Sequence, residues 1–88
     1  MAVSVDHFGN VITNLPVTLA ALQLKPFTLQ TNANPIQRFC RTFAEVTDAD
    51  PFIYAGSSGY FEIGMNQGSA ADALGIQTGD PVTLDVNA

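Results

Sequence analysis

The stretch Asp6-His7-Phe8-Gly9-Asn10-Val11-Ile12-Thr13-Asn14 joins a glycine-containing turn to an apolar strand. A second stretch of the same kind, Ser57-Ser58-Gly59-Tyr60-Phe61-Glu62-Ile63, follows about fifty residues later. Glycine allows the tight backbone of such turns, where short polar side chains and backbone N–H groups converge. The two stretches predict two turns that lie side by side and together hold a polar ligand.

The pattern around these stretches predicts an all-β fold. Apolar runs bounded by turn residues predict strands at 3–5, 11–13, 27–31, 36–39, 52–55, 60–65 and 82–86, with a further short strand at 43–46. Pro16 opens one short helix at 17–22, and Ser69 caps a second helix at 70–74, which Gly75 ends. About seven short strands and two short helices predict a small closed or nearly closed barrel.

The composition predicts a single domain with a covered face. The chain has 88 residues, of which 47% are hydrophobic and 12% are charged. A chain of this length forms one core. Because a solvent-exposed surface usually carries more charge, we expect part of the apolar surface to be buried against another subunit or a missing domain.

The charge and the cysteine content exclude several classes of function. The formal net charge is −5, and the basic residues form no patch, so we expect neither nucleic acid nor a membrane as a partner. Cys40 is the only cysteine, which excludes an internal disulfide and favours a reducing, cytoplasmic setting. We interpret Cys40 as a small buried side chain.

We expect no metal, no cofactor and no catalytic residue within this chain. Metal sites need clustered histidine, cysteine or carboxylate side chains, and the sequence has no such cluster. Asp6 and His7 are adjacent on an extended segment and point to opposite faces, so they do not form a dyad. Glu62 has no identified partner that would make it a general base.

Each turn has both a structural and a functional interpretation. Asp6 and Asn10 can serve only their own loop, as such residues often do. Alternatively, the Asn10 amide pairs with an adenine edge, Asp6 accepts from an ammonium group and Phe8 forms an apolar wall. Ser57 and Ser58 can likewise serve only a turn, or their hydroxyl and N–H groups can bind a carboxylate.

Both stretches resemble the C-terminal domain of the S-adenosylmethionine (SAM) hydrolase family, the SAM hydroxide adenosyltransferases, which are related to the fluorinase and chlorinase. The first matches the family signature Asp-x-Phe-Gly-Asn-x-x-Thr-Asn. The second matches Asn-Ser-Ser-Gly-Tyr-Leu-Glu-Ile, with Gly56 replacing the asparagine and Phe61 the leucine. Asn66-Gln67-Gly68-Ser69-Ala70-Ala71 continues the resemblance, which runs from Val5 to about Val82.

The resemblance implies roles for particular residues. Asp6 would hold the methionine ammonium group, and the serine pair would hold the carboxylate. The adenine would contact Phe8, Asn10, Phe43 and the backbone near Gln67, although a core position for Phe43 is an equal alternative. Thr13 and Asn14 would be structural. Because the related halogenases have arginine at the position of Ser58, this serine points to the hydrolase branch. The implied substrate-binding residues are Asp6, Phe8, Asn10, Phe43, Ser57, Ser58 and Gln67.

The resemblance also implies that this chain supplies half of a site. The family converts SAM and water to adenosine and methionine, and its N-terminal domain handles the water. We therefore expect residues 1–88 to be the C-terminal barrel of a two-domain enzyme that forms a homotrimer, without the catalytic N-terminal domain and inactive alone. Two alternatives stay open, a stand-alone module that binds adenosyl ligands and a structural or oligomerisation barrel.

Overall fold

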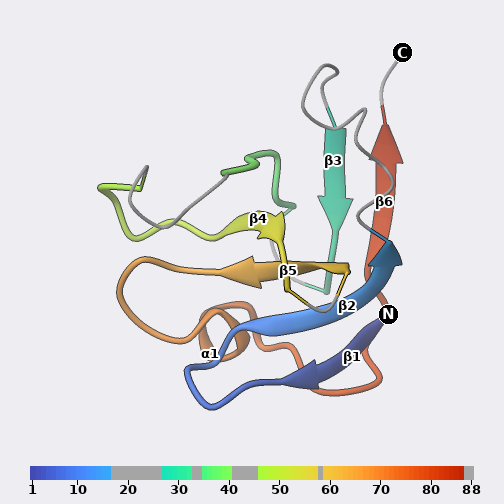
Figure 1. The fold of residues 1–88 in the computed structure, drawn as a ribbon, viewed down its shortest axis with the longest axis horizontal. Helices are drawn as coiled ribbons and strands as arrows, with labels where there is room; N and C mark the ends of the chain where they lie inside the picture. The colour runs from blue at the N-terminus through green and yellow to red at the C-terminus, as the bar shows by residue number, and fades with distance from the viewer. Residues whose placement is uncertain (17–26, 33–34, 41–45, 58, 87–88) are drawn as a thin grey trace.

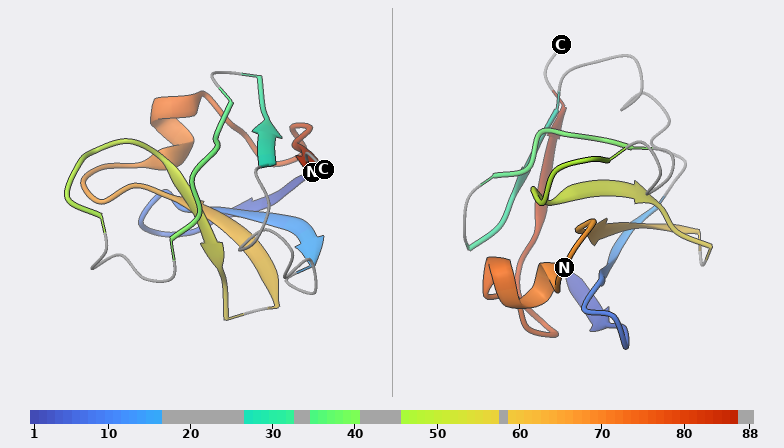
Figure 2. Two further views of the ribbon diagram at one scale, coloured as in Figure 1. Left: turned by 90° about the horizontal axis from the view of Figure 1, so that it is seen from above. Right: turned by 90° about the vertical axis from the view of Figure 1, so that its left-hand side faces the viewer.

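The computed structural model describes residues 1–16, 27–32, 35–40, 46–57 and 59–86 (Figure 1). Four antiparallel strands form one sheet in the order β1 (Ala2–Val5), β2 (Val11–Pro16), β5 (Tyr60–Gly64) and β4 (Phe52–Ala55). A second antiparallel sheet pairs β3 (Phe27–Gln30) with β6 (Thr83–Val86). The strands of the second sheet run steeply across those of the first (Figures 1 and 2).

This arrangement confirms the all-β prediction. Within the described part of the chain, however, the two sheets stay separate and no closed barrel forms, so barrel closure stays a prediction. The helix predicted at 17–22 lies outside the described residues, as does nearly all of the strand predicted at 43–46.

The strand predicted at 36–39 is wrong as a continuous strand. Ile36 bridges Leu29 of β3, whereas Phe39 bridges Ile53 of β4 in the parallel sense. The Cys40 N–H donates to the Ile53 carbonyl, and the Ile53 N–H donates to the Arg38 carbonyl, at 2.9 Å each. The segment crosses from one sheet to the other, so it pairs briefly with each and forms no ladder of its own.

The four-stranded sheet has a core face and a second face. Side chains of alternate residues point to opposite sides of a strand. The core face packs against α1 (Ala70–Leu74) and β3. The buried cluster that these elements form together includes Val11, Leu29, Ile53, Phe61, Ile63, Ala70 and Leu74. The second face carries a smaller cluster of Cys40, Val46 and Phe52, against which Tyr54 packs. The interpretation of Cys40 as a buried side chain is confirmed.

Helix α1 has the predicted ends and holds the turn that precedes β2. The Ser69 hydroxyl accepts a hydrogen bond from the Asp72 N–H, and Gly75 ends the helix at φ 64°. The Ala71 N–H donates to the Gly9 carbonyl at 2.9 Å. A side chain at Gly9 would collide with Ser69, so the turn and the helix are in close contact. None of the helices that the structure describes could cross a membrane.

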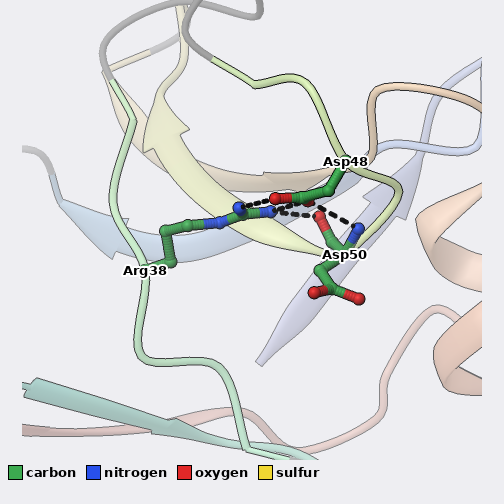
Figure 3. Close-up of polar contacts among 3 residues, drawn as sticks. All are labelled: Arg38, Asp48 and Asp50. Carbon is green, nitrogen blue, oxygen red and sulfur yellow. Dashed lines mark hydrogen bonds and ion pairs between the residues drawn. The ribbon is translucent and has the colours of Figure 1, made fainter.

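An ion pair fixes the loop that precedes β4 (Figure 3). Arg38 Nη1 and Nη2 donate to the two carboxylate oxygens of Asp48, at 2.7 and 2.8 Å. Nη2 also donates to the Asp50 carbonyl at 2.6 Å. The Arg38 guanidinium, with the Asp50 N–H, lowers the pKa of Asp48 to about 2. The Arg38 guanidinium also lies 5.8 Å from the centre of the Phe52 ring, which links this surface loop to the smaller cluster.

Candidate functional site

Asp6 organises the turn between β1 and β2 through its carboxylate. Its Oδ1 accepts from the N–H groups of Phe8 and Asn10, at 2.9 Å each, and its Oδ2 accepts from Asn10 Nδ2 at 3.1 Å. The backbone N–H of Gly9 donates to the Asp6 carbonyl at 3.0 Å. The Asp6 carboxylate therefore holds its own loop, which is the part of the structural interpretation that the bonds support.

Two opposing effects act on the pKa of Asp6. Desolvation raises it, but the hydrogen bonds from Asn10, Phe8 and Gly9 together outweigh this effect and lower the pKa below its ordinary value. Asp6 thus keeps its negative charge at neutral pH. The same bonds fix the Asn10 amide, because only its nitrogen can donate to the carboxylate.

A pocket of about 500 Å³ lies beside this turn and is lined by Phe8, Asn10, Met65, Asn66 and Gly68. The Phe8 side chain is 75% exposed, and its ring stands edge-on to His7 at 5.4 Å between centroids. Gln67 is exposed between the lining residues Asn66 and Gly68. The fold therefore brings three of the predicted adenine-binding positions, Phe8, Asn10 and the segment around Gln67, to one place.

The turn between β4 and β5, which carries Ser57 and is called the serine turn below, lies at the opposite end of the strands. Val11 of β2 pairs with Ile63 of β5, whereas Pro16 pairs with Tyr60, so the turn before β2 adjoins the end of β5. Ser57 precedes the start of β5 and is exposed. The prediction that the two turns lie side by side is wrong because β2 and β5 are antiparallel. Ser58 and Phe43 lie outside the described residues.

Tyr54 and Glu62 form a polar pair on the second face of the sheet, between these two ends. They are directly opposite each other on β4 and β5, and the Tyr54 hydroxyl donates to Glu62 Oε1 at 2.7 Å. Glu62 is 8% exposed. Burial raises the pKa of Tyr54 strongly, and hydrogen bonding to Glu62 and the charges of Glu62 and Asp6 raise it further. The Tyr54 hydroxyl is therefore protonated and donates at physiological pH.

Sequence reasoning missed this partner of Glu62, although a signal was present. The predicted strands at 52–55 and 60–65 flank a short turn, which predicts a hairpin. Pairing outward from the predicted ends, residue 55 with residue 60, would set residue 54 opposite residue 61, one position short of the observed Tyr54–Glu62 pair, so the signal gives the hairpin but not its register.

Thr13 of the first stretch has a structural role. The Thr13 hydroxyl, 1% exposed, donates to the Phe61 carbonyl at 2.7 Å and accepts from the Leu15 N–H at 3.2 Å. This confirms the structural interpretation of Thr13. Among the residues with described positions, no group of three or more histidine, cysteine or carboxylate side chains could hold a metal ion.

The comparison with protein families decides the family of this chain. Residues 2–83 match the SAM hydroxide adenosyltransferase C-terminal domain. The chain belongs to this family. The turn before β2 and the β4–β5 hairpin, which carried the resemblance in the sequence, both lie within the matched range.

Curated relatives of this SAM hydroxide adenosyltransferase C-terminal domain are named (R)-S-adenosyl-L-methionine hydrolases. The protein of Thermus thermophilus is 40% identical over 80 residues, which are 90% of this chain and 29% of the relative. The protein of Salinispora tropica is 35% identical over 77 residues, which are 88% of this chain and 28% of the relative. The chain therefore spans less than a third of the length of these relatives.

Two solved structures share the fold. An uncharacterised protein of Thermotoga maritima matches with a TM-score of 0.77 and 26% identity, over 92% of this chain and 32% of that one. A hypothetical protein of Thermus thermophilus matches with a TM-score of 0.69 and 30% identity, over 98% of this chain and 33% of that one. In both, the domain corresponds to about a third of a longer protein.

Proposed function

We propose that this chain is the substrate-binding C-terminal domain of an enzyme that converts SAM and water to adenosine and L-methionine. The observation that carries the proposal is the pocket beside the turn before β2. Phe8 and Asn10, to which the resemblance assigns adenine, both line it. The family match and the names of the curated relatives support the same reaction.

Asn10 would recognise the adenine edge. One Nδ2 hydrogen is directed at Asp6, which leaves the second hydrogen and the Oδ1 atom for a ligand. Adenine presents an acceptor nitrogen beside an amine, and this pattern matches the remaining donor and acceptor of Asn10. Phe8 would cover the base, with Phe43 as a second aromatic contact and the backbone near Gln67 at the base edge.

The methionine portion would extend from this pocket along the strands toward the serine turn. Ser57 and Ser58 would bind the carboxylate. The ammonium group is on the same carbon atom and would therefore also lie near the serine turn, so Asp6, at the other end of β5, would add negative charge to the site and not contact the ammonium group as the resemblance implies. Because the pocket and the serine turn lie at opposite ends of β5, the ligand would bind in an extended conformation.

A second surface would complete the site. Val3, Val5, Phe8 and Tyr60 are large apolar side chains that are 37% to 75% exposed. Such exposure supports burial against an N-terminal domain, from a neighbouring subunit of a cytoplasmic homotrimer in this proposal. That domain would supply the groups that act on water. This chain alone would need no cofactor and would have no turnover.

The test is adenosine release from SAM by the complete protein that carries this domain. We expect Asn10→Ala to lower kcat/KM by about 5- to 150-fold, as loss of a 1–3 kcal/mol contact requires. Asn32→Ala, at an exposed asparagine outside the pocket, is the matched control. Unchanged activity of the Asn10 variant would refute the adenine assignment, and adenosine release by the 88-residue chain alone would refute the half-site.

A further inference from the structure

We infer that Glu62, held by Tyr54, determines the specificity of this site for a positively charged adenosyl ligand over a neutral nucleoside. The inference rests on the proposed function and adds a residue to which the resemblance gave no role. The ligand class that it names is an adenosyl compound with a sulfonium or an ammonium group. Either group can supply the charge, and the experiment below separates them.

The first observation is the burial of the Glu62 carboxylate. The residue is 8% exposed on the central strand β5, and the Tyr54 hydroxyl is its hydrogen-bond donor among the described residues, at 2.7 Å. A carboxylate in such a place is screened less by water than a surface carboxylate, so its field extends further.

The second observation is the position of Glu62 relative to the two ends of the proposed site. Its side chain reaches under the serine turn, because a Cβ built on Gly56 would lie only 1.9 Å from Glu62 Oε2. On its other side, Glu62 pairs with Ile12 of β2, which lies two residues after Asn10 of the pocket. Glu62 therefore lies between the serine turn and the turn before β2.

The third observation is the sign of the charge in this region. Asp6 and Glu62 are both carboxylic acids, and Arg38, the one arginine or lysine among the residues that the structure describes, is paired with Asp48. An extended adenosyl ligand that joins the pocket to the serine turn would pass Tyr54 and Glu62 with the part of the molecule that carries its positive charge. Among the described residues Asp6 accepts from three donors, whereas Glu62 accepts from one, so fewer of the Glu62 lone pairs are occupied.

The experiment compares Glu62→Gln with the unsubstituted complete protein at neutral pH, by calorimetry for the probes that the protein does not convert and by KM from initial rates for any probe that it converts. The probes are SAM, with both charges; S-adenosylhomocysteine, with the ammonium group only; 5′-dimethylsulfonio-5′-deoxyadenosine, with the sulfonium only; and adenosine, with neither. Asp85→Asn removes an equal charge at an exposed position on β6 and is the matched control.

We expect Glu62→Gln to weaken SAM binding about tenfold or more, the order expected for unit charges in a partly screened site. Adenosine binding should stay within about twofold. A matching loss for the dimethylsulfonio probe assigns the charge to the sulfonium, and a matching loss for S-adenosylhomocysteine assigns it to the ammonium. Asp85→Asn should change none of these affinities by more than about twofold.

Two results would overturn the inference while the proposed function stands. One is an equal loss for all four probes, adenosine included, which would mean that Glu62 only supports the fold. The other is no loss for SAM in a folded Glu62→Gln protein. If the unsubstituted complete protein bound neither SAM nor adenosine, the proposed function would itself fail, and the inference with it.

Discussion

Replacing Gly56 with alanine should destabilise the domain because Glu62 occupies the space that the new methyl group needs. A Cβ at residue 56 would lie 1.9 Å from Glu62 Oε2, 2.6 Å from Cδ and 2.8 Å from Cγ. Gly56 has no positive φ, so alanine brings no backbone strain at this position. The whole effect is therefore steric, and overpacking of this kind typically costs about 1–3 kcal/mol.

The size of the effect depends on where the Glu62 side chain can go. It is buried, and its carboxylate accepts the Tyr54 hydroxyl at 2.7 Å. Moving it away from Gly56 would lengthen or break a hydrogen bond to a charged group, and such bonds contribute about 1.5–3 kcal/mol. The two routes give similar costs, so we expect about 2 kcal/mol of lost unfolding free energy.

Urea unfolding of a double-mutant cycle measures this interaction. Gly56→Ala should cost much less in a Glu62→Ala background, where the opposing side chain is absent, and the coupling should exceed about 1 kcal/mol. Gly59→Ala is the matched control, because Gly59 has φ 92° and no described atom within 4 Å of a built Cβ. It should cost about 1–2 kcal/mol through backbone strain alone, in either background. Equal costs of Gly56→Ala in the two backgrounds would refute the reasoning.

Three further predictions concern the turn before β2 and its helix. Gly9→Ala should lower the free energy of unfolding in urea by at least about 2 kcal/mol, because φ is 85° and the new Cβ would meet Ser69 Oγ at 2.0 Å; a neutral variant would contradict this contact. Ser69→Ala should cost about 1 kcal/mol by the same measurement through loss of the helix cap, and no loss would mean that the cap bond is not formed in solution. Asp6 has a lowered folded-state pKa, so its contribution to stability is present above the unfolded value of 3.8 and is lost as the pH falls through the folded value; Asp6→Asn should therefore flatten the acid side of the Tm–pH profile, and an unchanged profile would rule this out.

The sequence predicted best those elements that local signals define. Ser69 and Gly75 mark both ends of α1, and the structure places its cap and its end at these residues. The strands on either side of the Asp6–Asn10 turn were also predictable, because glycine and Asx residues fix such a turn through nearby backbone groups. Residues 6–10 make these bonds within their own turn.

The relation between the two turns could not be read from local signals. It depends on the β2–β5 pairing, in which residues about fifty positions apart are neighbours, such as Ile12 and Glu62. No turn connects these strands, so nothing local fixes whether they run parallel or antiparallel. The antiparallel direction separates Ser57 from the Asp6 turn. The path of residues 36–40 also depends on pairing with other strands, because Ile36 bridges Leu29 and Phe39 bridges Ile53.

The length of β5 makes the two ends of the proposed site separable by experiment. Its five residues, at about 3.3 Å each, set the ends roughly 16 Å apart. A nucleoside in the pocket at Asn10 would then be too short to reach Ser57, whereas an adenosyl amino acid would have to extend to contact both. Asn10→Ala should therefore weaken adenosine and SAM alike, and Ser57→Ala should weaken SAM alone. If Ser57→Ala weakened adenosine binding as much as SAM binding, the extended ligand would be contradicted, because the base would then lie close to the serine turn.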